Sequence, residues 1–158
     1  MEHLLEVKNL SVSIDGPSGE VQAVRDVSFS LKKGEVLAIV GESGCGKSVL
    51  CKSIMKLLPP SAKIKEGSIS VNGQDITCYR EKEMQKLRGK IFSMIFQDPM
   101  TSLNPTIKIG KQIAEAVLIH NKNYTKEQVN QKVLELMELV GISPVSYTHL
   151  TLPTICSV

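Results

Sequence analysis

A glycine-rich segment at positions 41–48 constrains the fold of this chain more than any other feature. It reads Gly-Glu-Ser-Gly-Cys-Gly-Lys-Ser and fits the pattern G-x-x-x-x-G-K-[ST]. An unbroken apolar run at 36–40 precedes it, and a stretch with helical character at 47–58 follows it. Such a short pattern also occurs by chance in ordinary glycine turns. The order of apolar strand, glycine loop and helix nevertheless favours a phosphate-binding loop in an α/β domain.

The residue types in this segment suit the phosphates of a nucleotide. Glycines allow a tight turn that brings backbone N–H groups close to phosphate oxygens. We expect Lys47 to reach the β- and γ-phosphates of ATP, and the Ser48 hydroxyl to hold Mg²⁺. Cys45 occupies a variable position of the pattern, so we assign it no catalytic role. The expected nucleotide-binding residues of the loop are Gly41, Glu42, Ser43, Gly44, Cys45, Gly46, Lys47 and Ser48.

Composition narrows the classes of protein to which the chain can belong. Of its 158 residues, 42% are hydrophobic and 22% are charged, which is typical of one globular domain. The formal net charge is only +3 and no run of five basic residues occurs, so we expect no nucleic-acid partner. The four cysteines form no C-x-x-C pair, which argues against a zinc site. Neither a membrane-spanning apolar stretch nor a signal-peptide pattern is present, so we expect a cytosolic location.

Strand patterns dominate the first half of the chain. Segments 4–14 and 21–31 alternate loosely between apolar and polar residues. They flank the turn residues 15–19, and this arrangement predicts an antiparallel pair of strands. The continuous apolar runs at 36–40 and 91–96 predict two further strands, each buried on both faces.

Shorter elements are predicted between and after these strands. Ser68–Val71 followed by Asn72-Gly73 indicates a short strand and a tight turn. The charged segment 80–88 indicates an exposed helix, and residues 111–119 indicate another helix.

The clearest helical pattern covers residues 125–140. Thr125 and Gln128 are spaced as a capping box at its start, and Gly141 is placed to end it. The apolar residues that fall on one face are Val129, Val133, Leu136, Met137 and Val140. The whole pattern predicts an α/β fold, with a P-loop core, an antiparallel β-subdomain and the beginning of a helical subdomain.

A second motif separates the protein classes that share a phosphate loop. Residues 96–106 read Phe-Gln-Asp-Pro-Met-Thr-Ser-Leu-Asn-Pro-Thr. Taken alone, Gln97 is no more than a polar residue at the end of a strand. Together with segment 41–48, however, this stretch resembles the ATP-binding subunits of oligopeptide and dipeptide ABC importers and their nickel-transporting relatives. The resemblance extends from about residue 4 to residue 142 and includes segments 21–29 and 109–113.

This resemblance implies roles for individual residues. Gln97 would be the Q-loop glutamine, whose amide oxygen helps to hold Mg²⁺ and orients the attacking water, so Lys47 and Gln97 are the expected catalytic residues. Ile14 lies where members usually carry an aromatic residue that stacks on adenine. Isoleucine can cover the base but has no π face. Residues 99–105 would begin the helical subdomain that docks on the membrane subunits.

The resemblance also implies partners and a place of action. It implies a peripheral subunit at the cytoplasmic face of the plasma membrane that uses ATP hydrolysis to drive uptake. The implied partners are transmembrane permease subunits, a second ATP-binding subunit that closes an ATP sandwich dimer, and indirectly a solute-binding protein. The permease and the binding protein select the transported solute, which this chain therefore does not identify.

The family pattern ends near residue 143. The signature motif, the second acidic strand, the catalytic glutamate and the switch histidine do not follow, so we expect this chain alone not to hydrolyse ATP. We interpret residues 1–143 as the N-terminal portion of an ABC transporter nucleotide-binding domain. Residues 145–154 resemble one reading frame of a transposon-end sequencing adapter, and we interpret residues 144–158 as non-native. A natural divergent C-terminus is the alternative.

Three other functions share part of this pattern. A soluble ABC-type ATPase of DNA repair or translation would carry other residues after Gln97 and a more basic surface. A P-loop kinase would need an arginine-rich lid, and Arg80 and Arg88 are too isolated to form one. The third alternative is a non-catalytic nucleotide-binding fragment, which would apply to this chain by itself.

The interpretation of residues 144–158 predicts the result of resequencing. Amplification of the locus from source DNA should show the family pattern continuing after Ile142 or Ser143. Long reads that reproduce residues 145–158 followed by a genuine stop codon would contradict it.

Overall fold

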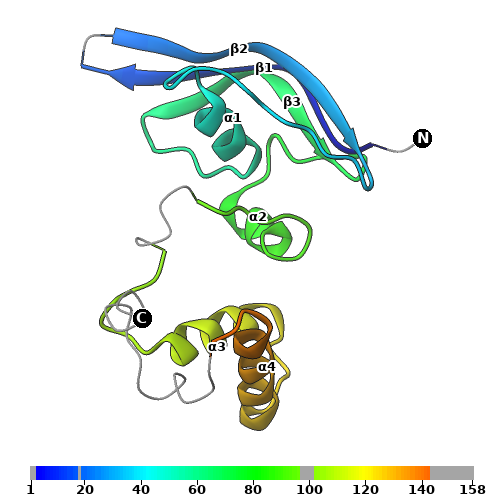
Figure 1. The fold of residues 1–158 in the computed structure, drawn as a ribbon. Helices are drawn as coiled ribbons and strands as arrows, with labels where there is room; N and C mark the ends of the chain where they lie inside the picture. Colours follow the sequence, from blue (N-terminus) through cyan, green and yellow to red (C-terminus); the bar gives the residue numbers. More distant parts are fainter. Residues whose placement is uncertain (1–2, 18, 97–101, 143–158) are drawn as a thin grey trace. The chain divides into compact units, whose positions relative to one another are not determined.

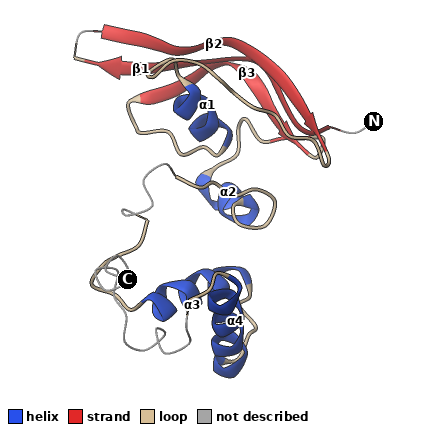
Figure 2. Ribbon diagram, viewed as in Figure 1, coloured by secondary structure: helices blue, strands red, loops and turns tan. Residues whose placement is uncertain are grey.

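The computed structural model describes residues 3–17, 19–96 and 102–142. The chain divides into two units, residues 1–88 and residues 89–158, which we treat separately. Gln97 and the expected non-native segment 144–158 lie outside the described residues. In the first unit, the strands form one antiparallel sheet in the order β2-β1-β3-β4 (Figures 1 and 2). These strands are β1 (His3–Gly16), β2 (Gly19–Lys32), β3 (Ala62–Val71) and β4 (Gln74–Asp75).

The predicted pair of strands is confirmed as the hairpin β1–β2. Ile14 pairs with Val21 near the hairpin turn, and β3 pairs with the other edge of β1. β1 is therefore an inner strand of the sheet, and its apolar side chains account for much of the core. The buried residues of this sheet include Val7, Leu10, Val12, Val24, Ile69 and Val71. The predicted turn at Asn72-Gly73 is also present, although β3 begins at Ala62 rather than at Ser68.

A pair of irregularities bends this hairpin. Asn9 on β1 and Asp26 on β2 both have a left-handed backbone, with φ values of 47°. The Asn9 side chain donates a hydrogen bond to Asp26 Oδ1 (2.8 Å), and the Asn9 backbone N–H donates to Ser28 Oγ (2.7 Å). Asn and Asp are the non-glycine residues that tolerate this conformation best. The two strands therefore deviate from regular pairing together, and both ribbons curve (Figure 1).

Helices α1 (Lys47–Ile54) and α2 (Glu81–Leu87) complete the first unit. α1 lies against one face of the sheet and buries Leu50 and Ser53 (Figure 1). The helix predicted at 47–58 is thus confirmed, but it ends at Ile54 rather than at Leu58. The predicted helix at 80–88 is also present, although Met84 is fully buried and the side chain of Arg88 is only 18% exposed.

The two buried strands predicted at 36–40 and 91–96 are wrong for this structure. Neither segment belongs to the sheet, and Val36 (92%), Val40 (87%) and Ile95 (98%) are almost fully exposed. A strand buried on both faces needs neighbouring strands to satisfy its N–H and C=O groups. Within the described residues, no strand takes that position beside either segment.

The second unit contains α3 (Ile109–His120) and α4 (Lys126–Leu139), which confirm the helices predicted at 111–119 and 125–140. The Thr125 hydroxyl accepts a hydrogen bond from Gln128 N–H (3.3 Å), and Thr125 N–H donates to Gln128 Oε1 (2.8 Å). The predicted capping box is therefore present. The two helices pack through a buried cluster that consists of Val117, Val129, Val133 and Met137. Within the described parts of the chain, no helix has the length and apolar character to cross a bilayer.

Gly141 ends α4 as the sequence predicts. Its φ is +74°, and the N–H groups of Gly141 and Ile142 donate to the carbonyls of Glu138 (3.0 Å) and Met137 (2.9 Å). This is the Schellman pattern, in which glycine takes the left-handed position at no steric cost. For most L-residues, the left-handed conformation costs about 1–2 kcal/mol.

The buried face of α4 generates a prediction of stability. We expect Met137→Ala to destabilise the α3–α4 pair by about 2–5 kcal/mol, because it opens a cavity at a fully buried position. Leu139→Ala is the matched control on the same helix, since Leu139 is 82% exposed, and it should change stability by less than about 0.5 kcal/mol. Amide hydrogen exchange in α4 measures both effects, and equal effects would contradict the packing described here.

Candidate nucleotide-binding site

The phosphate-loop residues 41–46 lead directly into α1, with Gly46 as the N-cap residue. Gly46 has φ +94°, and a Cβ atom at this position would collide with the backbone carbonyl oxygen of Ala23 on β2. Glycine is therefore required at position 46 by both conformation and space. This close approach positions the end of the loop, and hence the start of α1, on the sheet.

The N-terminus of α1 is open to an anion. No side chain caps it, and its first turn contains no acidic residue. The hydrogen bond from Leu50 N–H to Gly46 O (2.9 Å) closes the first turn. The N–H groups of Lys47, Ser48 and Val49 therefore have no acceptor within the helix. These N–H groups and the helix dipole attract negative charge to this end of α1.

The Lys47 ammonium group lies across the loop that precedes it. Its Nζ donates hydrogen bonds to the carbonyl oxygens of Gly41 (2.7 Å) and Glu42 (2.6 Å), and lies 3.4 Å from Cys45 Sγ. A lysine ammonium has three donors, and here they contact three atoms of the same loop. The ammonium group is thereby held within the loop that leads into α1.

Two further features of this segment are the close packing at Gly41 and a hydroxyl group that could bind a metal. A Cβ atom on Gly41 would lie 2.7 Å from Cys45 Sγ, so the loop is also closely packed at its first glycine. The Ser48 side chain, in the first turn of α1, is exposed. An exposed hydroxyl at this place suits Mg²⁺, which commonly binds few protein ligands together with phosphate oxygens. Among the residues that the structure describes, no cluster of three or more His, Cys, Asp or Glu is arranged to hold a metal.

Strand pairing in the β1–β2 hairpin relates Ile14 to the phosphate loop. Ile14 pairs with Val21, which is two residues along β2 from Ala23, the residue that contacts Gly46. The structure thus brings Ile14 and the loop to the same end of the β1–β2 hairpin. Gln97, the other expected catalytic residue, is outside the described residues.

Two ion pairs join this end of the hairpin to β3. Lys63 Nζ lies 3.3 Å from Asp15 Oδ2, and Lys65 Nζ lies 2.9 Å from Glu20 Oε1. The hydrogen bond from Lys65 is the main cause that holds the pKa of the Glu20 carboxyl below its ordinary value. All four side chains are substantially exposed, so these pairs contribute little to stability.

The fold is that of ATP-binding cassettes. The chain superposes on the ATP-binding cassette MJ0796, solved bound to ADP and Pi, with a TM-score of 0.75 at 20% sequence identity. The superposition covers 92% of this chain and 60% of that structure. The chain also superposes on cbiO1 from Clostridium perfringens, with a TM-score of 0.67 at 23% sequence identity. This superposition covers 93% of this chain and 54% of that structure.

Sequence comparison gives the family. Residues 24–155 match the ABC transporter family, and the chain belongs to it. It is 57% identical over 140 residues to the oligopeptide transport ATP-binding protein OppD of Bacillus subtilis (strain 168), covering 88% of this chain and 39% of that protein. It is 54% identical over 141 residues to the dipeptide transport ATP-binding protein DppD of Lactococcus lactis subsp. cremoris (strain MG1363), covering 89% and 40% respectively. The chain thus spans about two fifths of the length of the curated relatives it matches.

Sequence reasoning missed two residues that shape this site. Ala23 contributes a backbone carbonyl, which no side-chain pattern could have indicated. Arg88 binds the far end of α1 through the carbonyls of Met55 and Lys56, although it follows Gly46 by more than forty positions. In the sequence, Arg88 was only a charged residue at the end of a charged segment.

The contact between Gly46 and Ala23 generates the next prediction. We expect Gly46→Ala to destabilise the first unit by roughly 3 kcal/mol or more. The added Cβ would collide with the Ala23 backbone, and alanine would also have to adopt an unfavourable φ. Gly44→Ala is the matched control in the same loop. Its φ is +82°, but no atom lies within 4 Å of the added Cβ, so it should cost only about 1 kcal/mol. Urea denaturation compares the variants, and equal losses would contradict the proposed close approach.

Proposed function

We propose that this chain is part of a subunit as long as these relatives, which we call the full-length subunit. This subunit binds ATP with Mg²⁺ at residues 41–48. We further propose that it hydrolyses ATP to drive uptake of oligopeptides or dipeptides through a membrane ABC importer. The observation that carries this proposal is the 57% and 54% identity to ATP-binding proteins of oligopeptide and dipeptide transport. The open N-terminus of α1 beside the Lys47 ammonium supports it chemically.

The proposed roles of the site residues follow from their chemistry. Loop and helix N–H groups cradle the phosphates, and the Lys47 ammonium contacts the β- and γ-phosphates. Ser48 and Gln97 would hold Mg²⁺, which neutralises charge on the phosphates when it is bound. Gln97 would also orient the attacking water, and Ile14 would cover one face of the adenine. The nucleotide-contacting set also includes Gly41, Glu42, Ser43, Gly44, Cys45 and Gly46.

The same proposal gives partners and location. The full-length subunit would lie at the cytoplasmic face of the plasma membrane, bound to transmembrane permease subunits. It would form an ATP sandwich dimer with a second ATP-binding subunit and would act indirectly with a solute-binding protein. Residues 1–143 would form the N-terminal portion of its nucleotide-binding domain, and residues 144–158 would not belong to the natural sequence.

Substitution of Lys47 tests the proposal. In the full-length subunit, Lys47→Ala should weaken ATP binding by about tenfold to a hundredfold, because a charge-assisted contact to phosphate is lost. It should also abolish phosphate release and, in the assembled importer, ATP-dependent uptake of a labelled peptide. Fluorescent nucleotide binding, phosphate release and uptake into proteoliposomes measure the three steps.

Lys52→Ala provides a control for loss of charge on the same helix, because Lys52 lies in the last turn of α1 rather than the first. It should retain binding and turnover. Wild-type ATPase activity in Lys47→Ala would overturn the assignment of the loop. Normal ATPase activity without peptide uptake or binding to permease subunits would instead favour a soluble ABC-type ATPase.

A further inference from the structure

Helix α1 ends with a lysine in the left-handed position. The N–H groups of Lys56 and Leu57 donate to the carbonyls of Ser53 (3.0 Å) and Lys52 (2.8 Å), which is the same Schellman pattern that ends α4. In α4, glycine occupies the left-handed position, whereas in α1 the residue is Lys56, with φ +51°. A lysine in this conformation persists only where its surroundings hold it.

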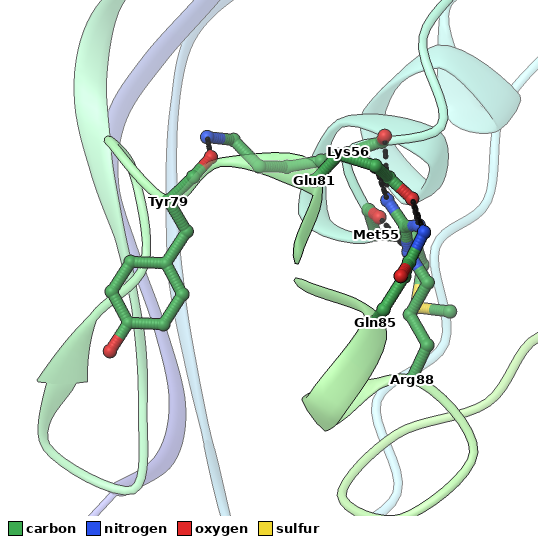
Figure 3. A network of polar contacts seen from close by, with 6 residues as sticks. All are labelled: Met55, Lys56, Tyr79, Glu81, Gln85 and Arg88. Carbon is green, nitrogen blue, oxygen red and sulfur yellow. Dashed lines mark hydrogen bonds and ion pairs between the residues drawn. The ribbon is translucent and has the colours of Figure 1, made fainter. Parts of the chain in front are cut away.

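Arg88 and Tyr79 supply those surroundings (Figure 3). Arg88 Nε donates to the carbonyl oxygen of Met55 (3.0 Å), and Arg88 Nη2 donates to the carbonyl oxygen of Lys56 (3.0 Å). The Lys56 side chain donates in turn to the Tyr79 carbonyl oxygen (2.7 Å). The guanidinium group therefore binds the carbonyl end of α1, where the helix dipole favours a cation.

Glu81 also holds the guanidinium group. Arg88 Nη1 and Nη2 donate to the two carboxylate oxygens of Glu81 at 2.6 and 3.2 Å, and Gln85 Nε2 also contacts Glu81 Oε1 (3.3 Å). The hydrogen bond from Arg88 is the main cause that holds the pKa of Glu81 below its ordinary value. The Arg88 side chain is 18% exposed and uses its planar fork to join two carbonyls and one carboxylate.

The position of this anchor matters because α1 is short and lightly packed. The helix has eight residues, of which only Leu50 and Ser53 are buried. A helix of this length is about 12 Å long, so a rotation of about 5° about its C-terminal end moves its N-terminus by about 1 Å. The N-terminus carries Gly46, Lys47 and Ser48. A displacement of about 1 Å in a positioning element can cost about a hundredfold in function.

We propose that Arg88 is a positioning residue for phosphate recognition, which acts by fixing the carbonyl end of α1 and thereby the direction of the helix N-terminus. This inference rests on the proposed nucleotide-binding function of residues 41–48. Arg88 does not touch the nucleotide in this scheme. Its role depends on the planar guanidinium group, whose donors reach both carbonyl oxygens and the Glu81 carboxylate. A lysine ammonium group, which is a compact point charge, cannot form the same set of hydrogen bonds.

The test compares Arg88→Lys and Arg88→Met with Lys86→Met in the full-length subunit. Lys86→Met removes a positive charge from an exposed residue of α2, the helix that ends just before Arg88. Competition against a fluorescent ATP analogue gives the affinities for inorganic tripolyphosphate and for adenosine. Thermal melting establishes that each variant is folded at the assay temperature.

We expect Arg88→Met to lower tripolyphosphate affinity by about tenfold or more and to leave adenosine affinity within about twofold. Arg88→Lys should fall between Arg88→Met and the unsubstituted protein, and Lys86→Met should match the unsubstituted protein. If folded Arg88 variants bind tripolyphosphate normally, or if both affinities fall by the same factor, Arg88 has only a structural role and the inference is overturned. If the unsubstituted protein and Lys86→Met bind neither ATP nor tripolyphosphate, the proposed function fails as well.

Discussion

Helix α1 is held by one contact at each end, and the proposed phosphate site depends on both contacts. At the start of the helix, the Ala23 carbonyl leaves room only for glycine at position 46. At its end, the carbonyls of Met55 and Lys56 accept hydrogen bonds from Arg88. Because the helix itself buries little apolar surface, the close steric approach at its start and the directional hydrogen bonds from Arg88 at its end define its orientation better than non-directional packing could.

The elements that follow local rules could be predicted from the sequence. The Thr125–Gln128 capping box and Gly141 at the end of α4 depend on neighbours a few residues away, and the structure confirms both. The contacts of Ala23 and Arg88 could not be predicted in this way. Each joins segments that are more than twenty positions apart through a backbone carbonyl, which leaves no trace in residue type.

The two predicted strands that are wrong show a limit of a different kind. The apolar runs at 36–40 and 91–96 indicate burial, but burial of a strand is a property of the sheet that surrounds it. Among the described residues that sheet is not formed around them, and side chains such as Val36 and Ile95 are exposed. The parts of the site that depend on one helix and one hairpin are nevertheless in place. The chain spans about two fifths of its relatives' length. The residues proposed to bind phosphate lie within it, whereas hydrolysis and transport are proposed for the full-length subunit and its partners.

In the proposed function, residues 41–48 and the first turn of α1 receive the phosphates of a nucleotide. Hydrogen–deuterium exchange of the full-length subunit, with and without ATP and Mg²⁺, tests this claim most directly, because a bound phosphate occupies the N–H groups at the start of α1. We expect protection to concentrate in peptides covering residues 41–51. Saturating nucleotide that leaves exchange in these peptides unchanged, while protection appears elsewhere in the chain, would contradict it.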